Sequence, residues 1–344
     1  MHATLPWMPQ DVPVIAVVGC SKNAGKTTTL NALLAGFGDD VPNPGVLSIG
    51  IDGEEVDFWL GVPKPRIEVR EGAFVATAEG ALAAGTALVE ICERTGASTL
   101  LGELVVGRVT AAGSVLLAGI RSKDDVRDAV AAMQRLGVKR IIIDGAYQRL
   151  VAADPEVSDG TIVATGAVLG TTVEQVALRT QEFLLRLRVP GSDVDADRAL
   201  MDAARSAGCM AIQALRAGDI VTVEGPTDPV AVRILGSGDV AVAVPGAVGD
   251  DLVRQCAALS AGRIRLLARD PTRLFLSPRE SAFFRKRHDL RVLRPIRVLA
   301  VTVNPYSVLG WTLPREPLVA AVKAIADGLP VVSFDVHPPP SAPG

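Results

Sequence analysis

The chain has 344 residues, of which 49% are hydrophobic and 4% aromatic, and its formal net charge is −3. This charge gives no overall attraction to nucleic acid or to an anionic membrane. No stretch of about twenty residues lacks both charge and proline, which argues against a transmembrane helix, and the N-terminus lacks the features of a signal peptide. The four cysteines are widely spaced and the three histidines scattered. We therefore expect a reduced, cytoplasmic protein without a zinc ribbon or a histidine metal cluster.

An apolar strand predicted at residues 13–19 leads into a loop of small residues and then into Gly-Lys-Thr-Thr, which opens a helix predicted from Thr29 to Phe37. This order is typical of a phosphate-binding loop. The backbone N–H groups of such a loop converge on an anion, and the helix dipole adds positive potential there. Lys26 would reach the outer phosphates and the Thr27 hydroxyl would hold Mg²⁺. The predicted nucleotide-binding residues are Gly19, Cys20, Ser21, Lys22, Asn23, Ala24, Gly25, Lys26, Thr27 and Thr28.

The loop departs from the pattern G-x-x-x-x-G-K-[ST] at its first glycine, where this chain has Cys20 preceded by Gly19. The alternative interpretation is a glycine-rich turn between strand and helix that carries an incidental lysine. That alternative leaves Lys26 unexplained, because a helix N-terminus disfavours a cation unless an anion is bound.

A second strand, predicted at residues 45–50, leads into the acidic segment 51–57. Many phosphate-loop enzymes use an acid at this place to orient Mg²⁺ or a water. Asp52 is therefore a candidate catalytic and metal-binding residue, and Glu54 and Glu55 are weaker candidates. The alternative is a solvated acidic loop. Residues 63–66, Pro-Lys-Pro-Arg, present two cations on a rigid turn, either to a phosphate, to a partner's acids or to solvent.

The next predicted elements are a strand at 73–77, an alanine-rich helix at 82–95, and strands at 98–107 and 114–119 that pair across a turn at 109–113. Glu103 lies within an apolar strand, so we interpret it as facing water at a sheet edge, with a functional role as the alternative. Ser122 and Asp125 form a capping box for a helix that ends at Gly137.

Residues 140–146 form a short apolar strand that ends in Asp144. An acid at the carboxyl end of a parallel strand can reach the Mg²⁺ that Thr27 would hold, as in a Walker B element. An aspartate after a strand is common in loops, so this motif alone is weak evidence for a metal site. It indicates one here because the predicted phosphate-binding loop precedes it in the same domain.

A strand at 161–167 and a helix from Thr172 to Leu187 complete the first domain, before the turn at Val189–Ser192. The remaining strands are expected at 219–224, 229–234, 239–244, 263–268, 291–303 and 330–335, and the helices at 197–216, 250–259 and 318–326. This alternation predicts an α/β fold, with a P-loop NTPase-like, mostly parallel sheet and flanking helices, followed by a smaller α/β domain. The predicted divisions are an N-terminal segment (1–12), a P-loop nucleotide-binding domain (13–190), a second α/β domain (191–336) and a disordered proline-rich tail (337–344).

Arginines are dense between residues 263 and 297, and Phe283 and Phe284 lie among them. A nucleic-acid groove is one interpretation. We expect a solvated face instead, because Asp270, Glu280 and Asp289 are interspersed, and a surface for a protein partner is an intermediate interpretation.

Together, Lys26, Thr27 and Asp144 would bind ATP or GTP with Mg²⁺ and stabilise the charge on a transferring phosphoryl group. The predicted catalytic residues are Lys26, Asp144 and Asp52, and the predicted metal ligands are Thr27, Asp144 and Asp52. The chain has no Asn-Lys-x-Asp run for guanine. Asn304 would read a base edge from its loop, or form a plain Asn-Pro turn.

Over residues 13–336 the motifs, in this order and spacing, resemble the phosphate-loop subunit of the lysine 5,6-aminomutase reactivase, within the SIMIBI-like P-loop NTPases. The matching segments are Lys22–Thr28 with Asn31, Ser48–Glu54, Pro63–Arg66, Ile143–Ala146, Ala164–Ala167, Asp270–Thr272 and Thr302–Pro305. The resemblance implies a helper that binds and hydrolyses ATP or GTP with a second ATPase subunit. It would free an adenosylcobalamin-dependent aminomutase of damaged cobalamin. The departures at Ile51, where a basic residue is expected, and at Cys20 bear on hydrolysis rather than on binding.

Two other functions compete with this one. The chain would be a stand-alone ATP-dependent kinase or ligase of the dethiobiotin-synthetase type, or a nucleotide-binding module like ParA or a molybdopterin-dinucleotide adaptor, by analogy of architecture alone. We expect no membrane partner and no nucleic acid, and a homodimer is compatible with the sequence.

Overall fold

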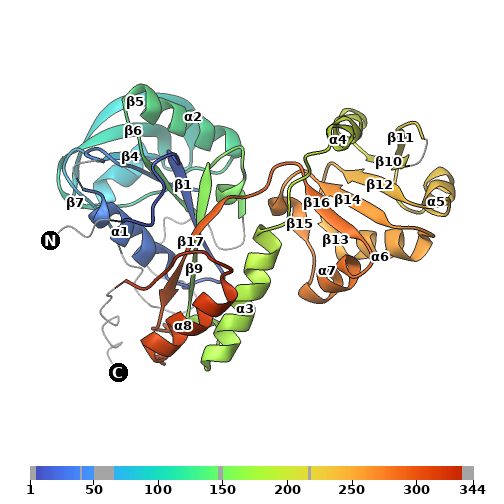
Figure 1. The fold of residues 1–344 in the computed structure, drawn as a ribbon. Helices are drawn as coiled ribbons and strands as arrows, with labels where there is room; N and C mark the ends of the chain where they lie inside the picture. The colour runs from blue at the N-terminus through green and yellow to red at the C-terminus, as the bar shows by residue number, and fades with distance from the viewer. Residues whose placement is uncertain (1–4, 39–40, 50–65, 146–149, 216–217, 335–344) are drawn as a thin grey trace. The chain divides into compact units, whose positions relative to one another are not determined.

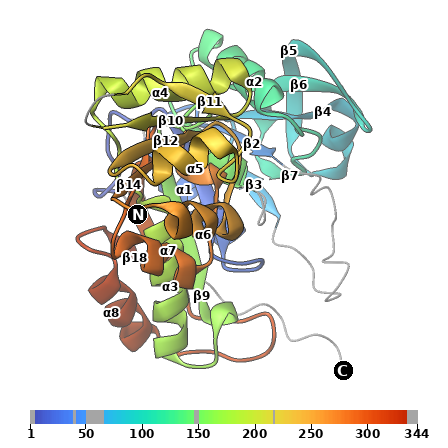
Figure 2. The same ribbon diagram turned by 90° about the vertical axis from the view of Figure 1, so that its right-hand side faces the viewer.

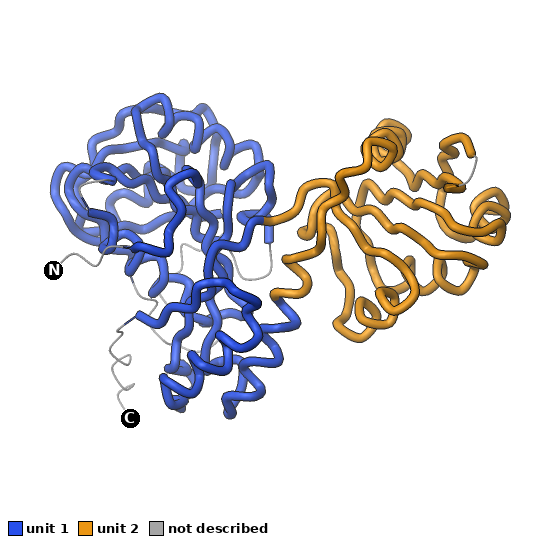
Figure 3. The backbone as a smooth tube through the Cα atoms, in the orientation of Figure 1, with its two compact units in different colours: residues 1–183, 297–344 blue, residues 184–296 orange. Residues whose placement is uncertain are grey.

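The computed structural model describes residues 5–38, 41–49, 66–145, 150–215 and 218–334. The chain forms two compact units (Figure 3): unit 1 comprises residues 1–183 and 297–344, and unit 2 comprises residues 184–296. The sequence predicted a continuous second domain over residues 191–336. The structure differs, because the chain returns to unit 1 at Arg297 and adds strands to the sheet of that unit.

Unit 1 is built on a nine-stranded sheet with the order β18-β17-β9-β1-β8-β2-β4-β6-β5 (Figure 1). The strands are β1 (Val14–Gly19), β2 (Gly45–Ile49), β4 (Phe74–Ala78), β5 (Leu88–Thr99), β6 (Gly102–Ala111), β8 (Ile141–Gly145), β9 (Gly160–Gly166), β17 (Val298–Asn304) and β18 (Val331–Val332). The strands from β18 to β4 are parallel, and β6 is antiparallel to both of its neighbours. A separate antiparallel pair joins β3 (Ile67–Val69) and β7 (Gly113–Val115).

Helices flank this sheet, so unit 1 is α/β with a large, mostly parallel sheet, as predicted (Figures 1 and 2). They are α1 (Lys26–Gly36), α2 (Lys123–Arg135), α3 (Val173–Leu187) and α8 (Arg315–Ile325), with 3-10 turns at Glu79–Ala84, Leu150–Ala153 and Ala167–Leu169. Leu30 and Leu33 of α1 are fully buried against the sheet, in one cluster with Val17 and Ile142. The predicted capping box of α2 is confirmed, since Ser122 and Asp125 exchange both hydrogen bonds.

The strand order contains a reversal at β1. From β1 the chain crosses over β8 to form β2, and from β8 it later crosses to the other side of β1 to form β9. The neighbours β1 and β8 therefore send their connections in opposite directions. In open parallel sheets, ligands bind at the carboxyl ends of the strands beside such a reversal, because the diverging loops leave a crevice there.

The predicted helix at 82–95 is wrong, because that stretch forms a 3-10 turn and the first half of β5. The alanines at 81, 83 and 84 favoured a helix, but the following residues alternate between exposed and half-buried positions as an edge strand does. The predicted pairing of 98–107 with 114–119 is also wrong: β6 pairs with β4 and β5, and β7 pairs with β3. Glu103 lies on an internal strand, and its carboxylate forms an ion pair with Arg94 at 3.2 Å.

Unit 2 contains a five-stranded sheet of order β11-β10-β12-β14-β16. Its elements are α4 (Asp195–Ala207), β10 (Met210–Ala214), β11 (Val221–Val223), α5 (Pro229–Leu235), β12 (Val240–Val244), β13 (Val248–Gly249), α6 (Asp250–Leu259), β14 (Ile264–Ala268), a 3-10 turn at Pro271–Arg273, β15 (Leu274–Phe275), α7 (Pro278–Arg285) and β16 (Asp289–Val292). None of the helices that the structure describes in either unit is both long and apolar enough to span a membrane.

Three predictions in this half are corrected. The helix expected at 197–216 ends at Ala207, because Gly208 adopts a left-handed conformation with φ 71° and the chain turns into β10. The strand expected at 229–234 is helix α5, whose N-terminus is capped by Asp228 and begins with Pro229. The extended strand expected at 291–303 is divided between β16 of unit 2 and β17 of unit 1.

His288 is buried in unit 2, where its Nδ1 accepts a hydrogen bond from the N–H of Ile264 at 3.2 Å. Burial lowers the pKa of His288 from its ordinary value of 6.5, and the charges of Arg287 and Arg263 lower it further. The unfolded chain therefore binds more protons than the folded chain below pH 6.5, so stability falls as the pH decreases through that window.

We expect His288→Asn to reduce the loss of thermal stability between pH 7.5 and pH 5.5, as measured by circular dichroism. The comparison with wild type cancels the contribution of the carboxylates. Equal slopes for wild type and variant would show that His288 does not carry this pH dependence.

Candidate phosphate-binding site

The loop after β1 folds back over the end of its own strand. The N–H of Cys20 continues the sheet by donating to the carbonyl of Ala164 at 2.9 Å. A Cβ added to Gly19 would lie 2.9 Å from the carbonyl oxygen of Ser21 and 3.1 Å from Cγ of Lys26. Only glycine fits under the alkyl chain of Lys26 at this place.

The loop enters helix α1 through two left-handed residues, Asn23 with φ 61° and Gly25 with φ 100°. A Cβ on Gly25 would also lie 3.0 Å from Cβ of Asn304. The first hydrogen bond of the helix joins the N–H of Thr29 to the carbonyl of Gly25 at 2.9 Å. The N–H groups of residues 26–28 precede that bond and point out of the helix N-terminus, as the first N–H groups of any helix do. The helix begins three residues earlier than predicted, so Lys26 and Thr27 lie in its first turn.

Neither the cap nor the first turn of α1 supplies a negative charge to the helix N-terminus. Its cap, Gly25, provides no side-chain hydrogen bond, and its first turn contains no acid. Every other α-helix in the described part of the chain has an acid in its first turn or a side-chain cap. The helix dipole and Lys26 together therefore make this end of α1 suited to an anion.

Asp144 lies on β8 directly beside the strand that carries the loop. Its Cα is paired with that of Val17 on β1 and with that of Ser48 on β2. Side chains alternate along a strand, so Asp144 is on the same face as Ile142, and Ile142 packs in one cluster with α1. The predicted Walker B acid and the helix N-terminus thus share one face at the carboxyl edge of the sheet.

The residues present suit Mg²⁺ better than a metal that needs many protein ligands. The described residues contain no group of three or more His, Cys, Asp or Glu side chains that could hold a metal ion. The hydroxyl of Thr27 and the carboxylate of Asp144 are hard oxygen donors, and Mg²⁺ typically takes one or two protein oxygens together with substrate phosphates. Buried Ser48 is a further oxygen on this face that the sequence analysis did not assign to the site. A serine near the end of an otherwise apolar strand was the available signal.

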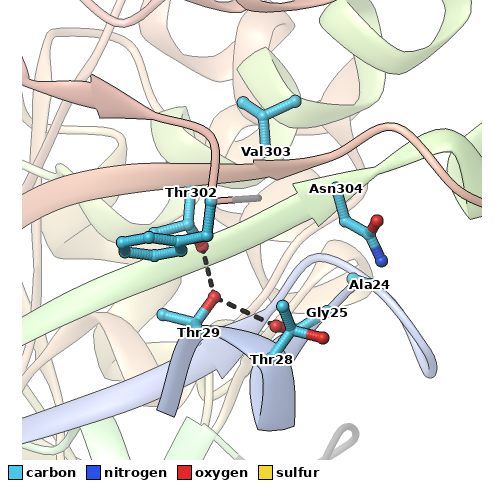
Figure 4. A pocket seen from close by; sticks show the side chains of 8 residues that line it. Ala24, Gly25, Thr28, Thr29, Thr302, Val303 and Asn304 are labelled. Atoms are coloured by element: carbon cyan, nitrogen blue, oxygen red, sulfur yellow. Dashed lines mark hydrogen bonds between the residues drawn. The ribbon is translucent and has the colours of Figure 1, made fainter. Parts of the chain in front are cut away.

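A small pocket lies on the opposite flank of the loop (Figure 4). Ala24, Gly25, Thr28, Thr29, Thr302, Val303, Asn304 and Phe334 line it. The hydroxyl of Thr29 bonds both the carbonyl of Gly25 at 3.0 Å and the hydroxyl of Thr302 at 2.6 Å, which ties the loop to β17. The side chain of Asn304 extends from the end of β17 toward Ala24 and Gly25. Its Oδ1 accepts from the N–H of Tyr306 at 3.1 Å, as in an Asn-Pro turn.

Two of the predicted site segments cannot be placed. Asp52 and the other acids of segment 51–57 lie outside the described residues, and so do residues 63–65. Arg66 is described, and its guanidinium donates to the hydroxyl of Ser114 at 3.5 Å while its carbonyl accepts from Asn31 at 2.8 Å.

The cysteine that replaces the first glycine of the motif is half-buried. Burial raises the pKa of the Cys20 thiol to about 12, against the opposing effect of hydrogen bonds with Thr165 and Thr180. Thr165 and Thr180 in turn share a buried hydrogen bond of 2.6 Å between β9 and α3. The Cys20 thiol therefore stays protonated at neutral pH.

We expect iodoacetamide at pH 8 to label exposed Cys92 well before Cys20, because the thiolate is the reacting species and the Cys20 thiol is protonated there. Mass spectrometry of tryptic peptides measures the order of labelling. Cys92→Ser should remove labelling at residue 92 and leave the labelling of Cys20 slow. Rapid labelling of Cys20 in that variant would mean that the thiol is open to the loop.

Comparison of the chain with protein-family models, with curated proteins and with solved structures gave no match.

Proposed function

We propose that this protein binds ATP or GTP with Mg²⁺ in the loop formed by residues 19–28 and hydrolyses it slowly. One observation carries the proposal. The loop and the N-terminus of α1, whose first turn contains no acid, follow the strand at which the strand order reverses, and Asp144 lies on the neighbouring strand, on the face that α1 covers. One sheet edge thus offers N–H groups and a lysine for an anion, and an oxygen ligand for a metal.

In this proposal the N–H groups at the start of α1 bind the phosphates, and the Lys26 ammonium neutralises their outer charge. Thr27 and Asp144 hold Mg²⁺, which supplies further charge stabilisation to the transferring phosphoryl group. Thr29 holds the carbonyl of Gly25 and so keeps the loop closed over the end of β1. Gly19 permits the close return of the chain beneath Lys26.

The nucleoside would lie on the flank of the loop opposite Asp144, outside the small pocket that Thr28 and Asn304 line. The amide of Asn304 is one polar side chain there that could contact a base edge. Its Oδ1 accepts a hydrogen bond from the N–H of Tyr306, and its NH₂ group is the donor that the base could accept from. Ring nitrogens and the guanine carbonyl both accept such a bond, which leaves ATP and GTP as candidates.

We further infer a helper function, in which the nucleotide drives the release of damaged cobalamin from an adenosylcobalamin-dependent aminomutase together with a second ATPase subunit. This inference is based on the resemblance to the reactivase subunit. It is compatible with a chain whose second compact unit has its own hydrophobic core and contributes no strand to the nucleotide-binding sheet.

Calorimetric titration with Mg·ATP and Mg·GTP tests binding, with no heat from either triphosphate as the result that excludes it. Phosphate release then tests the helper function. We expect hydrolysis to increase when an aminomutase loaded with damaged cobalamin is added, and to be insensitive to small metabolites. Stoichiometric phosphate release that requires a small carboxylate or amine would instead identify a stand-alone kinase or ligase.

A further inference from the structure

Unit 2 is basic although the whole chain is slightly acidic. Residues 184–296 contain 17 Lys and Arg against 13 Asp and Glu, a formal charge of +4, whereas the rest of the chain contains 18 against 25. The net charge of −3 therefore conceals two units of opposite sign. The negative charge of unit 1 repels a polyanion over long range, whereas the positive charge of unit 2 does not.

Helix α7, labelled in Figure 1, carries part of this charge. Five exposed residues of the helix and of the turn that follows it form what we call the α7 outer face: Arg279, Ala282, Phe283, Lys286 and Arg287. Their spacing of three and four residues puts them on one side of the helix. Phe283 is 65% exposed, whereas the neighbouring Phe284 is buried in the core of the unit. The N–H of Arg287 bonds the carbonyl of Phe284 at 3.2 Å, so the helical path continues through the last two cations.

The three acids that argued for a solvated face in the sequence do not neutralise this face. Asp270 is fully buried and pairs with Arg269 at 2.9 Å. Glu280 lies 3.4 Å from Arg254 of α6, and Asp289 lies 3.0 Å from Arg291. Among the described residues, none of the three forms an ion pair with Arg279, Lys286 or Arg287. Arg287 donates to the carbonyl of Ala261 at 3.2 Å, which uses one of its five N–H donors and leaves its charge without an acidic partner among the described residues. The positive charge of the α7 outer face is thus available to an external anion.

The chemistry of this face suits nucleic acid better than a protein partner. The core of a protein interface is mainly apolar and depleted in charge, whereas this face offers one ring among three cations. Protein–nucleic acid interfaces are polar and strongly positive. An exposed ring with a cation one helical turn before it and another one turn after it can stack a base while the cations contact the flanking phosphates.

We propose that the α7 outer face of unit 2 binds single-stranded nucleic acid, with Phe283 stacking a base and Arg279, Lys286 and Arg287 contacting phosphates. A duplex would bind less well, because its bases are already stacked and Phe283 would have no exposed base to contact. This binding is independent of the nucleotide proposed for unit 1, which involves other residues on another unit.

The test measures fluorescence anisotropy of a labelled twenty-nucleotide oligo-dT with the full-length protein at several salt concentrations. Phe283→Ala should weaken binding about tenfold, since stacking one base contributes roughly 1–3 kcal/mol. The matched control is Phe275→Ala, which removes a ring of similar exposure, 59%, that lies beside Arg186 and outside this face.

The double variant Lys286→Gln/Arg287→Gln should lower the slope of log affinity against log salt by about 1.4, or roughly 0.7 for each lost phosphate contact. Arg233→Gln, at an exposed position on α5, should leave the slope unchanged.

Lys26→Ala should bind the oligonucleotide as wild type does. Weaker binding by this variant would indicate that the oligonucleotide binds at the candidate phosphate-binding loop, and would overturn the proposal. No binding at 50 mM salt, or equal effects of Phe283→Ala and Phe275→Ala, would also overturn it. The proposal would also be overturned if polyglutamate displaced the labelled oligonucleotide as effectively as unlabelled oligo-dT does. That last result would identify the face as a site for an acidic protein surface.

Discussion

Lys26→Ala should abolish the thermal stabilisation that the wild-type protein gains from a purine triphosphate. A ligand at a hundred times its dissociation constant stabilises the folded state by about 2.7 kcal/mol, which corresponds to a rise of several degrees in the melting temperature of a unit of this size. Lys26 lies in the first turn of α1 against Gly19, so its loss removes the only cation that the described residues place in that turn. Differential scanning fluorimetry with and without Mg·ATP and Mg·GTP measures the shift.

Lys139→Ala is the matched control for this experiment. It removes the same charge from an exposed position just before β8, at the amino edge of the sheet and opposite the loop. We expect the nucleotide-induced shift to persist in this variant. Circular dichroism without nucleotide should show that both variants fold. A normal nucleotide-induced shift in the melting temperature of Lys26→Ala would exclude this loop as the nucleotide-binding site.

Asp144→Asn should eliminate the part of triphosphate binding that depends on Mg²⁺. The carboxylate lies beside the loop strand and shares the face of α1, so the amide keeps the shape of the site but loses the charge that attracts the metal. We expect wild type to bind the triphosphate at least tenfold more tightly with Mg²⁺ than with EDTA, a difference of about 1.4 kcal/mol. The variant should show equal affinity in both conditions when measured by calorimetry.

Asp128→Asn provides the comparison, because Asp128 is an exposed acid on α2 whose removal changes the net charge by the same amount. It should retain the full effect of Mg²⁺. A variant at Asp144 that retains this effect as well would exclude the carboxylate as a metal ligand. Loss of binding in both conditions would mean that Asp144 holds the loop rather than the metal.

Local sequence signals predicted most of the candidate phosphate-binding segment. The apolar run before Gly19 and the Gly-Lys-Thr-Thr that follows the small-residue loop specify strand, turn and helix within a few residues, and the structure has β1 and α1 there. The capping box at Ser122 and the strand that ends at Asp144 were found for the same reason. In each case the signal depends on neighbours along the chain, which sequence patterns report directly.

The failures lie where local propensity and tertiary pairing disagree. The alanines near residue 83 favour a helix, but residues 88–99 complete the edge of the sheet by pairing with β6. Residues 229–234 have the composition of a strand, and the cap at Asp228 with Pro229 converts them to a helix. Strand propensity depends on burial and on cross-strand neighbours, so it is a weaker guide than helix capping.

By itself, the sequence determined the loop, the helix that follows it and the acid at the end of β8, because these depend on residues within a few positions of one another. Only the tertiary structure decided that β17 returns from beyond unit 2 to pair with β9. This pairing brings Thr302 into a hydrogen bond with Thr29, 273 residues earlier in the chain, and brings Asn304 beside Gly25. It also decided which arginines the acids of unit 2 neutralise. Contacts between residues far apart in the chain depend on strand order and on the closing of long loops, and local sequence patterns predict neither.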